Sequence, residues 1–187
     1  IGDVFAMLDI LEALGVKSKW EDDCIVIDSR NVDEFAVPKH LMAEMRSSVF
    51  LMGSLLVRCG EAVIHKPGGC NIGKRPIDIH VAGLEALGFE VSSLDSQIAC
   101  KGVCHGGKIT LSYPSVGATE NLMMASLSGN GDTIIQNCAI EPEIIDLANF
   151  LNTMGADISG AGTSEIIING VKAESLQPIQ YTTIPDR

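Results

Sequence analysis

The sequence predicts an α/β (α+β) lobe built from three similar units, with buried helices and outer sheets. The first observation is an amphipathic helix pattern ending in glycine, which occurs at residues 7–15, 80–88 and 147–155. The second is the stretch after each of these glycines, which has the pattern of two strands around a turn. The third is that the next helix in the first two units is apolar on most of its faces, so it should be buried.

Each unit begins with a helix that ends at Gly15, Gly88 or Gly155, where glycine favours a left-handed cap. A hairpin should follow each helix, because the turns contain Glu-Asp-Asp, Leu-Asp-Ser and Gly-Ala-Gly-Thr-Ser. The expected strand pairs are, in chain order, 16–19 with 24–28, 89–93 with 97–101, and 156–159 with 165–169.

A second helix is expected at 41–58 in the first unit and at 117–128 in the second. Strands should follow these helices at 61–65 and 132–136. The three units are then roughly 1–66, 67–138 and 139–187, and the third lacks its second helix. The chain is therefore expected to be a single lobe truncated at both ends.

Composition excludes several classes of function. The chain has 187 residues and is 46% hydrophobic and 20% charged, so it should fold around an aliphatic core. Its net charge of −11 argues against nucleic acid as a partner, which needs a broad basic surface. No apolar run reaches the ~18 residues that span a bilayer, so no membrane association is expected. Six scattered cysteines suit a reducing cytoplasm.

A metal site is considered and rejected at Cys100-Lys-Gly-Val-Cys104-His105. Haem attachment needs two residues between the cysteines rather than three, and no second ligand pair follows at zinc-site spacing. We therefore expect neither a metal nor a cofactor.

The segment 67–80 carries the strongest chemical signal. Cys70 lies among three glycines, with Lys66, Lys74 and Arg75 close in sequence and only Asp78 opposing their charge. Nearby positive charge favours a thiolate and attracts anions, which indicates an anionic substrate. The alternative is a solvent-exposed loop with an incidental cysteine, and these features alone favour neither interpretation.

Two helix starts are further candidates. Free N–H groups at Ser115, Val116 and Gly117 could accept phosphate oxygens, although an ordinary serine N-cap explains the same residues. Arg46 stands in an apolar helix pattern and needs a partner, which is either a protein carboxylate or a bound anion. His80 is a weak candidate, because a lone histidine is usually structural.

Four motifs together resemble the UDP-N-acetylglucosamine 1-carboxyvinyltransferases. They are the Pro-Gly-Gly-Cys…Arg-Pro-Ile-Asp-Ile-His stretch of 67–80, Met-Arg-Ser-Ser at 45–48, Ser-Val-Gly-Ala-Thr at 115–119 and Glu-Pro-Glu-Ile-Ile-Asp-Leu-Ala-Asn-Phe-Leu at 141–151. The resemblance covers nearly the whole chain. It implies an inside-out α/β barrel of two lobes, each with pseudo-threefold βαβαββ repeats. It also implies transfer of the enolpyruvyl group of phosphoenolpyruvate to the 3-hydroxyl of UDP-N-acetylglucosamine, with release of phosphate, at the start of peptidoglycan synthesis.

The resemblance also implies a role for each matching residue. Cys70 would act as the general acid, form an adduct with phosphoenolpyruvate and be alkylated by fosfomycin. Arg46 and Arg75 would bind phosphoenolpyruvate, and His80 would lie near the site. The UDP-sugar would contact the residues Pro76, Ile77, Asp78, Ile79, Ser115, Val116 and Gly117.

Parts of the family pattern have no counterpart in this sequence. A Lys-Asn pair and the second lobe, with its aspartate and a further arginine, are missing. We therefore expect the segment alone to be inactive and to need the second lobe of the same chain as its partner. Two other functions stay open: 5-enolpyruvylshikimate-3-phosphate synthase, and a non-catalytic paralogue that binds a UDP-sugar.

Overall fold

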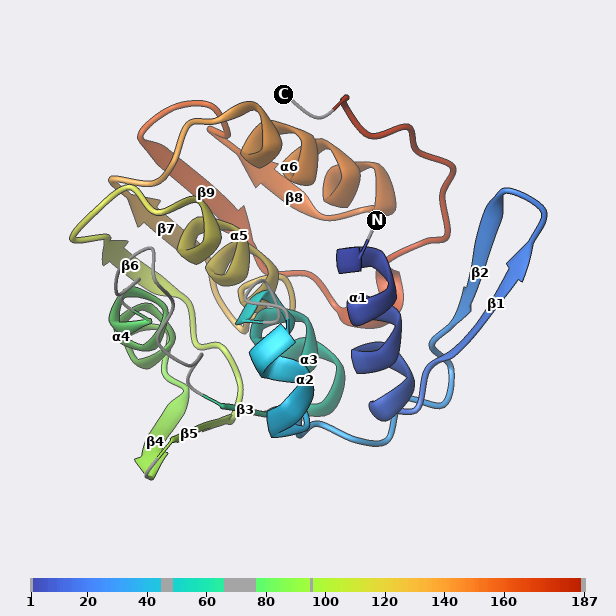
Figure 1. Ribbon diagram of the computed structural model, residues 1–187. Helices are drawn as coiled ribbons and strands as arrows, with labels where there is room; N and C mark the ends of the chain where they lie inside the picture. The colour runs from blue at the N-terminus through green and yellow to red at the C-terminus, as the bar shows by residue number, and fades with distance from the viewer. Residues whose placement is uncertain (1, 45–48, 66–76, 95, 186–187) are drawn as a thin grey trace.

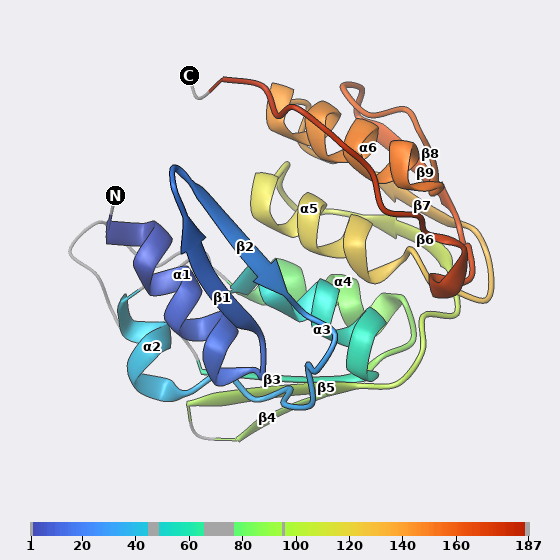
Figure 2. The ribbon, with the colours of Figure 1, turned by 90° about the vertical axis from the view of Figure 1, so that its right-hand side faces the viewer.

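Helices lie at the centre of the molecule and sheets lie outside them (Figures 1 and 2). The computed structural model describes residues 2–44, 49–65, 77–94 and 96–185. Its central helices are α3 (Leu51–Cys59), α4 (Asp78–Ala86) and α5 (Val116–Ala125). The predicted mixed fold, with buried helices and outer sheets, is confirmed.

Three sheets are present among the described residues, and each contains one of the predicted hairpins. The first is the antiparallel pair β1 (Lys17–Glu21) and β2 (Cys24–Asp28). The second is antiparallel throughout, in the order β3 (Glu61–His65), β5 (Gln97–Lys101) and β4 (Glu90–Leu94). The third has the order β6 (Gly107–Thr110), β7 (Thr133–Gln136), β9 (Glu165–Asn169) and β8 (Asp157–Ser159), and only β6 and β7 run parallel.

The three repeated helix patterns form α1 (Gly2–Ala13), α4 and α6 (Pro142–Met154). The glycine after each one has the left-handed backbone expected of a cap, with φ of +94° at Gly15, +95° at Gly88 and +111° at Gly155. A side chain is rarely tolerated there, so glycine ends all three helices for the same reason.

The second helices differ in detail from the prediction. The helix expected at 117–128 is α5, and most of its residues are buried. The helix expected at 41–58 is described as α2 (Lys39–Glu44) and α3, with 45–48 outside the described residues. Strand β6 was not expected, because four residues are too few to show a clear alternation. A short 3-10 helix, Ala173–Ser175, follows β9.

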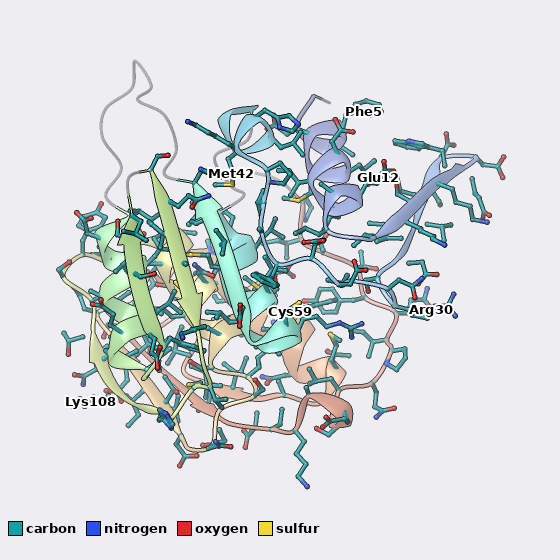
Figure 3. All side chains as sticks on the ribbon, turned by 90° about the horizontal axis from the view of Figure 1, so that it is seen from below. Phe5, Glu12, Arg30, Met42, Cys59 and Lys108 are labelled. Atoms are coloured by element: carbon teal, nitrogen blue, oxygen red, sulfur yellow. The ribbon has the colours of Figure 1, made fainter. Side chains whose placement is uncertain are left out.

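The hairpin β1–β2 extends away from the helical core. In Figure 3 it reaches beyond α1, the helix on which Phe5 and Glu12 are labelled. Trp20 and Ile27 on this hairpin are 53% and 51% exposed, and the ring centroids of Phe5 and Trp20 lie 5.9 Å apart. Within the described part of the chain, no helix is long and apolar enough to cross a membrane.

Candidate functional site

The predicted site residues divide into those the structure describes and those it does not. Arg46, Cys70, Arg75 and Pro76 lie outside the described residues. The described ones stand at two helix starts: Ile77, Asp78, Ile79 and His80 at α4, and Ser115, Val116 and Gly117 at α5.

Ser115 is the N-cap of α5. Its backbone is extended, with φ −86° and ψ 121°, and its Oγ accepts a hydrogen bond from the Ala118 N–H at 3.3 Å. The first intrahelical bond joins the Thr119 N–H to the Ser115 carbonyl at 2.9 Å. The N–H groups of Val116 and Gly117 precede that bond, so neither has a partner within the helix. The serine cap and a potential anion site therefore coexist at this helix start.

Gly117 lies where three helix starts meet. A Cβ added to Gly117 would lie 2.7 Å from Cε1 of Phe50 and 3.6 Å from Cε1 of His80. Phe50 is the N-cap of α3, and His80 lies in the first turn of α4. The start of α5 therefore faces the side chains of Phe50 and His80, and a larger residue at 117 would have to displace the Phe50 ring.

His80 is buried, with 9% of its surface exposed. Burial lowers its pKa to about 4, so the ring is neutral at physiological pH. Its Nδ1 lies 3.0 Å from Nδ2 of Asn121 on α5. His80 therefore has a structural role, because its ring contacts Asn121 within the helix packing. It also faces Gly117 at the candidate site.

Asn121 was missed by the sequence analysis. It is completely buried, and its Oδ1 accepts a hydrogen bond from the Gly53 N–H at 2.6 Å. Its Nδ2 donates to the Val49 carbonyl at 3.3 Å. A signal was available in the sequence, because the run Thr119-Glu120-Asn121 interrupts an otherwise apolar helix and a buried polar group needs partners.

Three glycines let the helix backbones approach closely. A Cβ at Gly53 would overlap the backbone oxygen of Asn121, and one at Gly83 would lie 2.5 Å from Cδ1 of Leu122. With Gly117, these residues place one glycine in each central helix. The start of α4 has no side-chain cap, and with the start of α5 it directs the positive end of a helix dipole to this region, whereas the Gly53 N–H of α3 is already bonded to Asn121 Oδ1.

Glu120 contributes a second perturbed group. Its carboxyl lies half-buried on α5, and burial, followed by the charge of Glu143 on α6, raises its pKa to about 7.

Among the described residues no group of three His, Cys, Asp or Glu side chains could hold a metal ion. Cys104, which was considered as a metal ligand from the sequence, is buried, and its Sγ accepts a hydrogen bond from the Gly106 N–H at 3.4 Å.

Comparison with known proteins identifies the family of this chain. The family model described as EPSP synthase (3-phosphoshikimate 1-carboxyvinyltransferase) matches residues 1–187. The UDP-N-acetylglucosamine 1-carboxyvinyltransferase 2 of Caldanaerobacter subterraneus subsp. tengcongensis is 52% identical over 186 residues, which are 99% of this chain and 44% of that protein. The UDP-N-acetylglucosamine 1-carboxyvinyltransferase of Finegoldia magna is 48% identical over 188 residues, again 99% of this chain and 44% of that protein.

Solved structures show the same fold at lower identity. The enolpyruvyl transferase NikO from Streptomyces tendae superposes with a TM-score of 0.80 at 22% identity, over 97% of this chain and 43% of that one. An EPSP synthase from Acinetobacter baumannii superposes with a TM-score of 0.69 at 19% identity, over 94% and 40%. The chain spans less than half the length of the relatives it matches. Because the family model matches the chain from end to end, this chain belongs to the EPSP synthase family.

Proposed function

We propose that the chain is one lobe of an enzyme that transfers the enolpyruvyl group of phosphoenolpyruvate to the 3-hydroxyl of UDP-N-acetylglucosamine. The relatives at 52% and 48% identity are named UDP-N-acetylglucosamine 1-carboxyvinyltransferases, and 1-carboxyvinyl is another name for the enolpyruvyl group. The remaining length of those relatives would supply the second lobe, and the site would form between the two lobes. The lobe alone would then be inactive.

The observation that supports this proposal most is the meeting of three helix starts at Phe50, His80 and Gly117. The chain enters α3 from the segment that contains Arg46, and it enters α4 from the segment that contains Cys70 and Arg75. Both substrates are polyanions, and both would gain from the positive helix ends and from the two arginines. A single anion-binding region is thus the simplest role for residues that are distant in sequence.

In the proposed reaction, the acceptor oxygen attacks C2 of phosphoenolpyruvate, and its hydroxyl proton passes to a base that the second lobe would supply. Cys70 gives a proton to C3, which produces a tetrahedral adduct. One C3 proton is then removed, and the bond from C2 to the phosphate oxygen breaks, so the double bond re-forms and phosphate leaves. Arg46 and Arg75 would hold the carboxylate and phosphate of phosphoenolpyruvate and stabilise the developing charge.

The UDP-sugar would lie along the starts of α4 and α5. Its uracil would contact Pro76 and Ile77–Ile79, and its diphosphate would bind the free N–H groups of Val116 and Gly117 beside Ser115. Five cysteines of the described residues are free, which suits a reaction in the reducing cytoplasm.

The test is phosphate release by the full-length protein with phosphoenolpyruvate, offered either UDP-N-acetylglucosamine or shikimate 3-phosphate. We expect release with the UDP-sugar alone, and its loss in Cys70→Ala. Cys24→Ala is the matched control, because Cys24 is exposed on strand β2, outside the helix starts of the candidate site, and this variant should keep wild-type activity. Cys70→Asp should retain a proton donor but resist fosfomycin, since a carboxylate attacks the epoxide poorly.

Each other outcome identifies an alternative. Release with shikimate 3-phosphate would indicate the sister enzyme named by the family model. Release with neither acceptor, combined with binding of the UDP-sugar, would indicate a non-catalytic paralogue. Full activity in Cys70→Ala would exclude the general-acid role.

A further inference from the structure

The Asn121 side chain, in the second turn of α5, bonds to the first turns of α3 and α4. It belongs to α5, its Oδ1 accepts from the Gly53 N–H of α3, and its Nδ2 meets His80 Nδ1 of α4 at 3.0 Å. The same Nδ2 donates to the Val49 carbonyl, just before α3, at 3.3 Å. One fully buried amide therefore uses both of its ends to connect segments that are distant in sequence.

These bonds define the orientation of the amide and the tautomer of His80. The Gly53 N–H can only donate, so the group that faces it must be Oδ1 of Asn121. The NH₂ group then faces the Val49 carbonyl and His80 Nδ1, so Nδ1 must accept. His80 is consequently neutral with its proton on Nε2.

The backbone of α3 packs closely against this amide at Gly53. A Cβ at Gly53 would lie 2.7 Å from Oδ1 of Asn121 and would also overlap its backbone oxygen. The His80 ring faces the first turn of α5, because a Cβ added at Gly117 would lie 3.6 Å from its Cε1. A change in the amide would therefore be transmitted to the His80 ring and to the chain that enters α3.

We propose that Asn121 is a positioning residue: it holds His80 in the Nε2-protonated tautomer and ties the entry and first turn of α3 to α5. This inference rests on the proposed function, because the segments entering α3 and α4 contain Arg46, Cys70 and Arg75. Asn121 itself touches no substrate. It keeps the anion-binding groups of the three helix starts in one geometry.

The principal variant is Asn121→Asp in the full-length protein, which preserves side-chain shape. One carboxylate oxygen can still accept from the Gly53 N–H, but the other cannot donate to His80 Nδ1. We expect the ¹⁵N spectrum of the His80 ring to change from the Nε2–H tautomer to a form protonated at Nδ1. The kcat/KM for phosphoenolpyruvate should fall at least about tenfold.

A pair of His80 variants tests the same proposal if Asn121→Asp does not fold. His80→Gln can accept from Asn121 and still offer N–H donors, so it should keep activity within about threefold, whereas His80→Leu should lose at least about tenfold. Ser126→Ala is the matched control on α5. Ser126 is buried, but its hydroxyl bonds only to the Leu122 carbonyl of its own helix, so kinetics and tautomer should not change.

An unchanged His80 spectrum in Asn121→Asp would overturn the proposal. So would an altered tautomer with unchanged kcat/KM for both substrates, or equal activity in His80→Gln and His80→Leu. If the wild-type protein turns over neither acceptor, the proposed function fails, and the spectrum still decides whether Asn121 sets the tautomer of His80.

Discussion

Acidification should destabilise this fold through His80. Burial lowers the pKa of His80 from 6.5 to about 4, so between these values the unfolded chain binds a proton that the folded chain does not. Stability is therefore lost as the pH falls below 6.5. Each pKa unit corresponds to about 1.4 kcal/mol, which amounts to about 3 kcal/mol over the whole window and about 2 kcal/mol down to pH 5.

The assay is urea unfolding of the full-length protein at pH 7.5 and pH 5, for the wild type and His80→Gln. Glutamine can accept the Asn121 hydrogen bond without titrating, so the variant should lose about 2 kcal/mol less than the wild type on acidification. His40→Gln is the matched control, because His40 is exposed on α2, and this variant should respond to acid as the wild type does. Equal losses in His80→Gln and the wild type would refute the reasoning.

Two further predictions concern the central helices, both measured by urea unfolding of the full-length protein. Gly53→Ala should cost about 3 kcal/mol, because its Cβ would overlap the Asn121 backbone, whereas Gly2→Ala, with nothing within 4 Å, should change stability by less than about 0.5 kcal/mol. Glu120→Gln should stabilise the protein by about 1 kcal/mol at pH 8. Because the pKa of Glu120 is raised in the folded protein, the wild type loses stability as the pH rises towards 7 and this carboxyl ionises. Solvent screens part of this effect, because the side chain is only half-buried. The gain should vanish near pH 5, and a gain independent of pH would contradict this explanation.

The helices and hairpins were largely predictable because their signals are local. A glycine after an amphipathic pattern marks a helix end, and Gly15, Gly88 and Gly155 all adopt the expected left-handed backbone. Strand β6 was not predictable, because it depends on parallel pairing with β7, which begins only after the intervening residues 111–132.

The candidate site was predictable only in part. Ser115 and Gly117 could be recognised from their own neighbourhood as a helix start. The bonds from Asn121 to Gly53 and to His80 span 68 and 41 residues, so no local pattern shows which partners satisfy this buried amide. Sequence could show that a polar residue in an apolar helix needs partners, but only the packed helices show which ones.

Because the central helices are buried inside the sheets, the positions available to ligand-binding groups are limited. A helix that is apolar on most faces has few positions for charged groups along its length, so ligand-binding groups come mainly from its ends and from the segments that enter it. In this lobe α3, α4 and α5 begin in one region, and glycines at 53, 83 and 117 bring their backbones close together. The small residues of the core therefore control the spacing between the entering segments. Their enlargement should impair the proposed site even where no substrate is touched, and Gly83→Ala, whose Cβ would meet the buried Leu122 side chain rather than backbone, is one such change.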